Sequence, residues 1–479
     1  MPDLSAIVKA YDIRGVVPDE FDADTARALG AAFADVVAHP AGRTTVVIGH
    51  DMRPSSPELS GAFGEGAAWR GVDVVLIGLC STDGLYYASG AMDVPGAMFT
   101  ASHNPAQYNG IKMCHAGARP VGQDTGLSDV QRLAAQYLDE GIPAAAETGT
   151  LTERDMLAQY AAYLRSLVSL DGIRPLKVVI DAGNGMAGLT AGAVLGTDAG
   201  LSDLGLDIVP MYFDLDGTFP NHEANPLDPA NLIDLQAAVV AEQADIGLAF
   251  DGDADRCFVI DERGGAVNPS AITALVGLRE LAKEKAAGRQ ATIIHNLITS
   301  RAVPDLVEAA GGKAVRTRVG HSFIKGQMAE HDAVFGGEHS AHYYFRDFFF
   351  ADTGMLAAMH VLQALGTGSP TLSELSEMYT PYASSGEINS RVTDAGASRA
   401  RVLEAFGEDI AAGVVTVEEF DGLTFSHWHE NPRWWFNLRA SNTEPLLRLN
   451  VEAEDSDIMV KIRDGVLALV REGEGSGDE

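Results

Sequence analysis

Three aspartates at alternate positions form the segment of this sequence with the clearest chemical potential. Asp251, Asp253 and Asp255 follow the apolar run IGLAF and precede a second apolar run, CFVID. Carboxylates this close repel one another unless a cation lies among them, and hard oxygen ligands select Mg²⁺ or Ca²⁺. Arg256 lies directly beside them, and a metal ion with a guanidinium is what a phosphoryl group requires. The segment therefore predicts a divalent metal site open to a phosphate oxygen.

A serine lies among small and polar residues in the segment TASHNP, residues 100–105. The segment does not match the G-x-S-x-G turn of hydrolases, so the sequence gives no support for acyl transfer. Lys112 follows ten residues after Ser102 and offers a second charge. A phosphorylated Ser102 would supply a further ligand to the metal ion, whereas an isolated serine would be an ordinary turn residue.

Four further clusters combine basic and polar side chains. They are Tyr11, Asp12 and Arg14 in KAYDIRG; His321 and Lys325 in RVGHSFIK; Glu338, Ser340 and His342 in GGEHSAH; and Arg439, Ser441, Asn442, Thr443 and Arg448 in LRASNTEPLLRLN. Each cluster alone could equally be a structural turn. In so acidic a chain, however, basic residues placed within a few motif-like segments suit a binding site for a dianion.

The bulk charge excludes several classes of partner. The 479 residues include 34 Lys and Arg against 67 Asp and Glu, a formal charge of -33, which repels nucleic acids and anionic lipids. The first residues lack a basic region followed by an apolar one, and no apolar run reaches about 18 residues. Three cysteines fit a reducing compartment. We therefore expect a soluble cytoplasmic protein with no nucleic-acid or membrane partner.

The elements that must position these residues follow a recurring pattern. A β-branched apolar run, a short polar turn and a helical stretch recur at 44–56, 176–188 and 291–300. This pattern predicts α/β units with buried strands. Residues 366–370, GTGSP, have the composition of a linker, and the pattern after them predicts an α+β domain. The expected domains are three of α/β type, 1–150, 151–265 and 266–368, and one of α+β type, 369–479.

Two other motifs indicate different functions. GNGMAG, residues 183–188, matches the dinucleotide fingerprint, and a non-catalytic module would bind NAD there, although a tight strand-to-helix turn explains it as well. FDLDGT, residues 213–218, reads like the nucleophile motif of haloacid-dehalogenase-type sugar phosphatases, with Asp214 as the nucleophile. The next acidic loop has the wrong spacing for that class, and Pro210 interrupts the strand that should carry the nucleophile.

The motifs TASHNP, DGDADR, GEHSAH and RASNTEP, in this order and with AYDIRG in front, resemble the α-D-phosphohexomutase superfamily, in its bacterial phosphomannomutase/phosphoglucomutase branch. The resemblance covers essentially the whole chain. It implies an α/β fold with three related α/β domains and a C-terminal α+β domain around a central active-site cleft. DGTFPNHEANP, residues 216–226, also looks like a family segment, which argues against the phosphatase.

The resemblance implies an isomerase that exchanges phosphoryl groups with its substrate. Ser102 would be the phosphoserine and would hold Mg²⁺ together with the three aspartates of DGDADR. A sugar 1- or 6-phosphate would become a hexose 1,6-bisphosphate, which turns end for end and returns its other phosphate to Ser102. Lys112, His321 and Arg14 would serve in proton transfer or charge stabilisation, with a positioning role favoured for Arg14.

The same resemblance assigns substrate contacts to the polar clusters. Glu338 and Ser340 would bind the 3- and 4-hydroxyls of the sugar, and the loop RASNTEP would bind whichever phosphate is distal. The full set of implied substrate-binding residues is Tyr11, Arg256, Lys325, Glu338, Ser340, His342, Arg439, Ser441, Asn442, Thr443 and Arg448. The partners are then small sugar phosphates, and the chain is a monomer or a homodimer.

Two departures from the family pattern bear on the substrate. Ile298 stands where bifunctional relatives carry a lysine, and His339 occupies the variable position of the sugar loop. These residues favour interconversion of mannose 1-phosphate and mannose 6-phosphate, with glucose phosphates as further substrates. A phosphoglucosamine mutase or a phosphoglucomutase remains the alternative, because these sugars differ at a single carbon whose hydroxyl contributes only a few kcal/mol.

Overall fold

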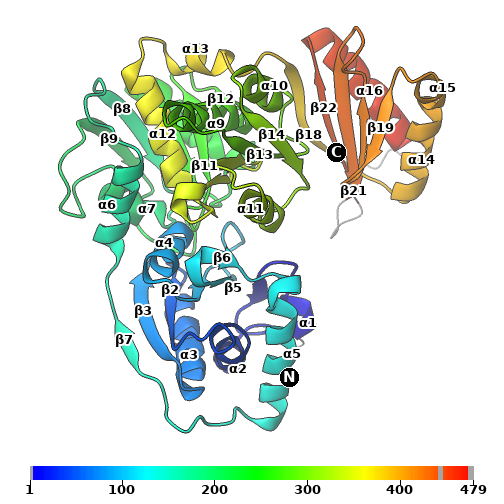
Figure 1. Ribbon diagram of the computed structural model, residues 1–479. Helices are drawn as coiled ribbons and strands as arrows, with labels where there is room; N and C mark the ends of the chain where they lie inside the picture. Colours follow the sequence, from blue (N-terminus) through cyan, green and yellow to red (C-terminus); the bar gives the residue numbers. More distant parts are fainter. Residues whose placement is uncertain (1–3, 441–445, 473–479) are drawn as a thin grey trace.

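The computed structural model describes residues 4–440 and 446–472, apart from the side chains of residues 321 and 322. Four β-sheets follow one another along the chain, each with helices packed against it (Figure 1). The first three sheets combine parallel and antiparallel strands, whereas the fourth is antiparallel throughout. This confirms the expected fold class, three related α/β domains followed by an α+β domain.

The first sheet contains seven strands. In spatial order they are β1 (Ile13–Val16), β5 (Tyr108–His115), β4 (Gly96–Phe99), β2 (Thr45–His50), β3 (Asp73–Leu79) and β7 (Leu151–Glu153), with β6 (Arg119–Pro120) paired to β5. Its helices are α1 (Leu4–Ile7), α2 (Ala23–Phe33), α3 (Ser56–Trp69), α4 (Thr82–Met92) and α5 (Leu127–Glu140). Strand β7 pairs with β3, so this sheet extends a few residues beyond position 150.

The second and third sheets contain five strands each. The second runs β12 (Ala266–Val267), β11 (Cys257–Asp261), β10 (Ile246–Phe250), β8 (Leu176–Asp181) and β9 (Leu206–Met211), with helices α6 (Leu157–Leu167), α7 (Ala187–Val194) and α8 (Ile233–Glu242). The third runs β14 (Lys313–Thr317), β13 (Thr292–Asn296), β15 (Phe335–Gly337), β16 (Tyr343–Phe345) and β17 (Ala351–Asp352), with helices α9 (Pro269–Ala286), α10 (Ala302–Ala309), α11 (His321–Glu330) and α12 (Gly354–Thr367).

The three α/β sheets share one arrangement. In each, a strand with a parallel neighbour (β4, β10 or β15) is followed by a strand that returns antiparallel to it (β5, β11 or β16). Strand β10 is fully buried along its length, as its uninterrupted apolar sequence predicts. The loops at this turning point are 100–107, 251–256 and 338–342, which carry TASHNP, DGDADR and EHSAH. The repeated topology therefore places three of the predicted motifs at equivalent positions.

The fourth sheet is built differently. Its order is β18 (Ala383–Arg391), β22 (Leu446–Ala453), β21 (Trp434–Ala440), β20 (Leu423–Ser426) and β19 (Thr416–Glu419), with helices α14 (Ala395–Ala405), α15 (Gly407–Ala411) and α16 (Ser456–Arg471). The short helix α13 (Leu372–Glu377) precedes it, and its start is fixed by a capping box between Thr371 and Glu374. The RASNTEP segment lies between the neighbouring antiparallel strands β21 and β22.

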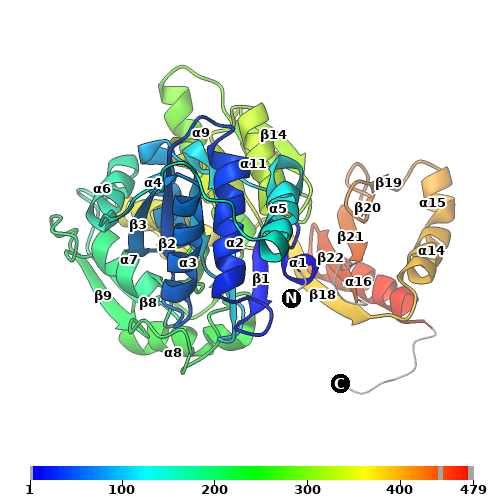
Figure 2. The same ribbon diagram turned by 90° about the horizontal axis from the view of Figure 1, so that it is seen from below.

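The domains differ in how closely they pack together. One apolar core runs through the second and third sheets and includes residues of α4 from the first domain, whereas the C-terminal domain has a core of its own. In both views the C-terminal domain packs beside the third domain and stands apart from the rest (Figures 1 and 2). Among the described residues, no helix is long and apolar enough to cross a membrane.

Candidate active site

Three loops from three domains meet at one place. An added Cβ at Gly252 would lie 2.4 Å from the carbonyl oxygen of Ser102, so the second loop touches the backbone of the first. Arg256 and His342 form an antiparallel backbone bridge, which joins the second loop to the third. The turning points of three separate sheets therefore converge, and the side chains they carry face a common centre.

Ser102 is buried at the place where these loops meet. Its backbone has a φ of 49°, in the left-handed region that non-glycine residues rarely adopt, and only 3% of the residue is exposed. Its Oγ donates to Oδ2 of Asp251 at 2.9 Å and lies 3.3 Å from Nη2 of Arg256. Nδ1 of His103 lies 3.2 Å from the same oxygen. The strained loop thus presents the hydroxyl between a carboxylate and a guanidinium.

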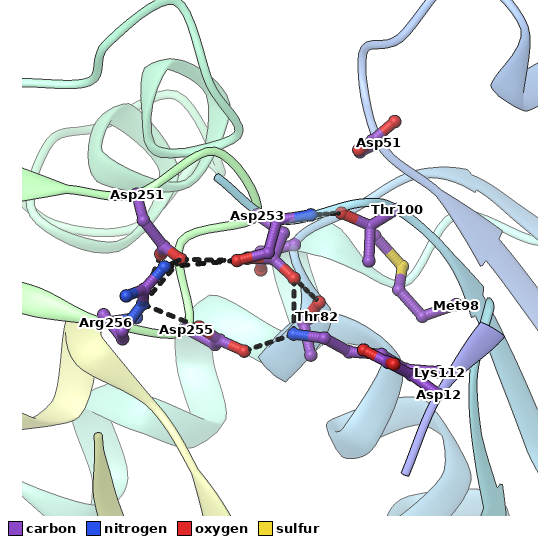
Figure 3. A network of polar contacts seen from close by, with 12 residues as sticks. Asp12, Asp51, Thr82, Met98, Thr100, Lys112, Asp251, Asp253, Asp255 and Arg256 are labelled. Atoms are coloured by element: carbon purple, nitrogen blue, oxygen red, sulfur yellow. Dashed lines mark hydrogen bonds and ion pairs between the residues drawn. The ribbon is translucent and has the colours of Figure 1, made fainter. Parts of the chain in front are cut away.

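The three aspartates of DGDADR gather around a small space (Figure 3). One oxygen from each of Asp251, Asp253 and Asp255 lies within 4.8 Å of the others, and all three residues are buried. Oδ1 of Asp253 and Oδ1 of Asp255 are buried without a hydrogen-bond partner. Unsatisfied buried carboxylate oxygens that face one another are costly unless a cation lies between them. The donor set therefore fits a hard divalent cation.

Two cations already flank these carboxylates. Nζ of Lys112 lies 2.7 Å from Oδ2 of Asp253 and 2.6 Å from Oδ2 of Asp255, and Nη2 of Arg256 lies 2.7 Å from Oδ2 of Asp251. Burial opposes ionisation of Asp255, but the ion pair with Lys112 holds its pKa at about 2. Burial dominates at Asp251 and raises its pKa to about 7.

Lys112 keeps its proton in this arrangement. Burial by itself would lower its pKa, but the carboxylates of Asp253 and Asp255 raise it well above the ordinary value. The side chain reaches from β5 of the first domain to the aspartate loop of the second (Figure 3). Of the two roles expected for Lys112, the geometry favours charge stabilisation over proton transfer.

The N-terminal cluster of Tyr11, Asp12 and Arg14 borders the serine loop, residues 100–107. Nη1 of Arg14 donates to Oδ1 of Asn104, and its Nε donates to Asp12 at 2.8 Å. The ring of Tyr11 packs edge-on against Phe323 of α11, with 6.2 Å between ring centres. This contact brings the N-terminal cluster beside the helix that begins at residue 321. The side chain of His321 lies outside the described residues.

The sugar-binding residues expected from the sequence lie together in the third loop. Oγ of Ser340 donates to Oε2 of Glu338 at 3.1 Å, and Nδ1 of His342 lies 3.4 Å from the same oxygen. Burial opposes protonation of His342, but its contact with Glu338 raises its pKa. Nε2 of His342 lies 3.6 Å from Oδ1 of Asp255, so the sugar loop adjoins the aspartate loop.

Lys325, which is also predicted to bind substrate, is buried. Only 4% of the residue is exposed, and its Nζ lies 2.7 Å from Oδ1 of Asp352. The ammonium group also lies 4.1 Å from the ring centre of Tyr86, a cation–π contact. Its role toward the substrate stays a prediction.

The two arginines expected at the distal phosphate lie on neighbouring strands. Arg439 on β21 is directly opposite Arg448 on β22, and each lies 3.4 Å from a carboxylate oxygen of Glu387. Ser441, Asn442 and Thr443 lie outside the described residues. These arginines belong to the C-terminal domain, which packs beside the third domain and away from the first (Figure 1).

Both alternative motifs have structural explanations. The GNGMAG segment joins β8 to α7, and an added Cβ at Gly188 would lie 2.1 Å from the carbonyl oxygen of Phe213. An added Cβ at Gly185 would lie 2.7 Å from the carbonyl oxygen of Gly252, in the aspartate loop. The glycines thus allow close backbone packing. The side chain of Asp214 is exposed on the loop after edge strand β9.

Several residues at the site were not predicted. Arg53 is fully buried beneath the serine loop, and Thr82 donates to Oδ2 of Asp253 at 2.6 Å. His103 accepts from Nη2 of Arg256 at 2.6 Å, and burial lowers its pKa to about 2, so its imidazole is neutral. Of these, only His103 carried a sequence signal, because it lies inside TASHNP.

Asp83 joins three domains next to this site. The carboxylate is fully buried and accepts hydrogen bonds from the hydroxyls of Ser81 in the first domain, Tyr160 on α6 and Thr353 at the start of α12. Burial raises the pKa of Asp83 to about 6, although the three donors oppose this. The ionised form is therefore disfavoured in the folded protein.

The pH dependence of stability should reveal this group. Its contribution to the free energy of unfolding is greatest below an unfolded pKa of about 4 and falls by ~3 kcal/mol as pH rises through about 6, because one pKa unit corresponds to about 1.4 kcal/mol. Asp83→Asn should therefore gain stability relative to the unmodified protein over this range. Urea unfolding of both proteins across the range measures the difference, and a pH-independent difference would contradict the assignment.

Comparison with known proteins identifies one family along most of the chain. Sequence models of the phosphoglucomutase/phosphomannomutase family match its alpha/beta/alpha domain I at residues 5–137, domain II at 158–265, domain III at 268–382 and its C-terminal domain at 387–469. The chain belongs to this family. As a phosphohexomutase it is an isomerase, so the expected superfamily is confirmed, and the haloacid-dehalogenase-type phosphatase using Asp214 and the NAD-binding module are both wrong.

Similar phosphohexomutases come from several bacteria. A phosphomannomutase of Salmonella typhimurium is 40% identical over 97% of this chain and 98% of its own length. A protein of Xanthomonas campestris named as a phosphohexose mutase is 38% identical over 95% of this chain and 96% of its own. The crystal structure of a Burkholderia thailandensis family protein aligns with a TM-score of 0.84 at 31% identity, covering 100% of this chain and 99% of that one.

Proposed function

We propose that this phosphohexomutase is a phosphomannomutase that interconverts mannose 1-phosphate and mannose 6-phosphate through a phosphoserine at Ser102 and a hexose 1,6-bisphosphate. The observation that carries the proposal is the position of Ser102 Oγ. It lies 2.9 Å from Oδ2 of Asp251, and the two aspartates grouped with Asp251 each have a buried oxygen without a hydrogen-bond partner. The name of the Salmonella relative supports mannose phosphate as the substrate.

The residues around Ser102 divide the work of phosphoryl transfer. Asp251, Asp253 and Asp255 would hold Mg²⁺, which when bound neutralises charge on the transferred phosphoryl group. The guanidinium of Arg256 and the ammonium of Lys112 add fixed positive charge around the same oxygens. Because Arg256 is buried and Lys112 is largely buried, they act in a medium of lower dielectric constant than water, where electrostatic stabilisation is stronger.

The transfer exchanges one phosphorus–oxygen bond for another. The bond between phosphorus and Ser102 Oγ breaks while a bond forms to a hydroxyl oxygen of the sugar phosphate. The proton of that hydroxyl passes to a base, and the departing Oγ takes up a proton to become the serine hydroxyl. His321 is the candidate for that base, because Lys112 is held protonated and Arg14 is an arginine, which keeps its proton. Arg14 then holds Asn104 and the serine loop in place. The reverse transfer, from the opposite end of the sugar, uses the same groups.

The remaining clusters would hold the sugar during both transfers. Glu338 and Ser340 offer a carboxylate and a hydroxyl to the sugar hydroxyls beside His342. The paired Arg439 and Arg448, with the loop between them, offer positive charge to the distal phosphate. Since the C-terminal domain packs beside the third domain, it would move toward the serine loop to complete the site. The buried free thiols of Cys80, Cys114 and Cys257 are consistent with a cytoplasmic location.

A parallel assay of three sugar phosphates tests the substrate. Mannose, glucose and glucosamine 1-phosphates would be supplied with Mg²⁺ and a trace of hexose 1,6-bisphosphate, and formation of each 6-phosphate followed. We expect the highest kcat/KM for mannose 1-phosphate, with glucose 1-phosphate about tenfold to 100-fold lower, since one hydroxyl contributes a few kcal/mol at most. A preference for glucosamine 1-phosphate would assign the chain to the phosphoglucosamine mutases instead.

A further inference from the structure

The guanidinium of Arg53 is enclosed beneath the serine loop. Arg53 lies between β2 and α3, and none of its side chain is exposed. Its Nε lies 3.3 Å from Oδ2 of Asp51, and Oδ1 of Asp51 accepts from the backbone N–H of Arg53 and from Oγ of Ser56. Asp51 therefore fixes both the backbone and the side chain of Arg53. A buried ion pair of this kind needs further hydrogen bonds to satisfy its remaining donors.

Those further hydrogen bonds go to the serine loop, residues 100–107, and to Tyr108, the first residue of β5. Nη1 donates to the carbonyl oxygens of Pro105 and Tyr108, each at 2.9 Å. Nη2 donates to the carbonyl oxygens of Ser102 at 3.0 Å and Asn104 at 2.6 Å. The planar guanidinium thus satisfies three carbonyls of the loop and that of Tyr108 at once, which a lysine ammonium with three tetrahedral donors cannot do.

Besides Arg53, the side chain of Arg14 holds this loop through its hydrogen bond to Asn104. Ser102 has a φ of 49°, and the loop contains few backbone hydrogen bonds of its own, among them Asn104 N to Ala101 O and Tyr108 N to Pro105 O. A strained conformation persists only where its surroundings fix it. Ser102 itself is held at two points: its carbonyl oxygen accepts from Arg53, and its Oγ donates to Asp251. The guanidinium therefore fixes the backbone of the residue that carries the reacting oxygen.

The second domain closes over Arg53 from the other side. The ring centre of Phe219 lies 5.1 Å from the guanidinium carbon, a cation–π contact. An added Cβ at Gly217 would lie 2.6 Å from the Cα of Arg53, so the backbone of this segment presses on the arginine directly. Arg53 therefore links the loop that carries Ser102 to the domain that carries the three aspartates.

We propose that Arg53 is a positioning residue for phosphoryl transfer: its hydrogen bonds to the serine loop and to the start of β5, covered by Phe219, hold Ser102 Oγ in register with the aspartates of the second domain. Arg53 touches neither the substrate nor the reacting atoms. The inference rests on the proposed function of Ser102. It predicts slower transfer in the folded protein with little effect on KM. Because a loss of folded protein would also lower the apparent kcat, the rate is expressed per folded molecule, with the folded fraction measured by circular dichroism.

The test compares two lysine variants. In Arg53→Lys, phosphorylation of Ser102 by hexose 1,6-bisphosphate and kcat should both fall about 100-fold, because a displacement of about 1 Å has effects of this size. KM should stay within about threefold of the unmodified value, since uniform binding is unchanged. The matched control is Arg165→Lys, because Arg165 also donates to three backbone carbonyls, of Val194, Gly196 and Ser202, within the second domain. Its transfer rate should be unchanged.

Each outcome bears on the proposal. Transfer at the unmodified rate in a folded Arg53→Lys protein would overturn it. If that variant does not fold, Phe219→Leu replaces it, because it removes the aromatic cover and keeps the guanidinium; a rate lower by about tenfold is expected, and an unchanged rate would overturn the proposal. Absence of phosphorylation in the unmodified protein would instead overturn the proposed function, so the two failures are distinguishable.

Discussion

Replacing Ser102 by alanine should lower mutase turnover by at least about 1,000-fold, since removal of a nucleophile eliminates the covalent route altogether. The substitution removes one oxygen and its hydrogen bond to Asp251. It leaves the carbonyl of Ser102 bonded to Arg53, so the loop keeps its main support. The loss of activity should therefore appear without loss of the fold.

Two measurements check this expectation. Intact mass after incubation with a labelled hexose 1,6-bisphosphate should show one phosphoryl group on the unmodified protein and none on Ser102→Ala. Ser398→Ala is a suitable control, because Ser398 is equally buried but lies on α14 of the C-terminal domain. Near-normal turnover in Ser102→Ala, or phosphate retained at another residue, would refute the role given to this serine.

Much of the fold could be predicted from the sequence because its parallel strands are uninterrupted apolar runs. IGLAF and LKVVID became β10 and β8, buried strands of the second sheet. The repeat of strand, turn and helix indicated three related units. The repeat could not reveal that the three motif loops lie at the same position in each sheet. That position depends on which strands pair, and the local sequence does not indicate strand pairing.

The site was only partly predictable, for reasons that differ among residues. The aspartates of DGDADR stand out because alternate carboxylates are costly without a cation. Arg53 and Asp83 do not stand out, because their partners are backbone carbonyls and hydroxyls from distant segments. Lys325 was predicted to bind substrate from its motif and the family resemblance, and the structure adds that its ammonium group lies beside Asp352 and Tyr86, which the sequence does not indicate.

The net charge of the buried side chains at the aspartate loop indicates what this site can bind. When all three carboxylates are ionised, as ligands of a divalent cation are, they face two cations, Lys112 and Arg256, and one negative charge remains uncompensated among these five groups. Buried charge without a partner is strongly destabilising. A bound divalent cation would therefore offset this negative charge and leave one positive charge, which would attract the phosphoryl group.

Asp253→Asn should accordingly have the second large effect. Oδ2 of Asp253 accepts hydrogen bonds from Lys112 and Thr82, whereas its buried Oδ1 has no hydrogen-bond partner. The amide removes one negative charge from the metal site and weakens the hold on Lys112. We expect turnover to fall by about 100-fold to 1,000-fold, and the Mg²⁺ concentration giving half-maximal activity to rise at least about tenfold, because hard cations prefer charged oxygen ligands.

A magnesium titration of activity distinguishes this effect from misfolding. The control is Asp261→Asn, since Asp261 ends strand β11 and only accepts from backbone groups of its own turn, at Arg263 and Gly265. That variant should show the magnesium dependence of the unmodified protein. If Asp253→Asn required no more magnesium than the control, Asp253 would not be a metal ligand. Its carboxylate would then serve mainly to fix Lys112, and Lys112→Met should reproduce the loss of turnover.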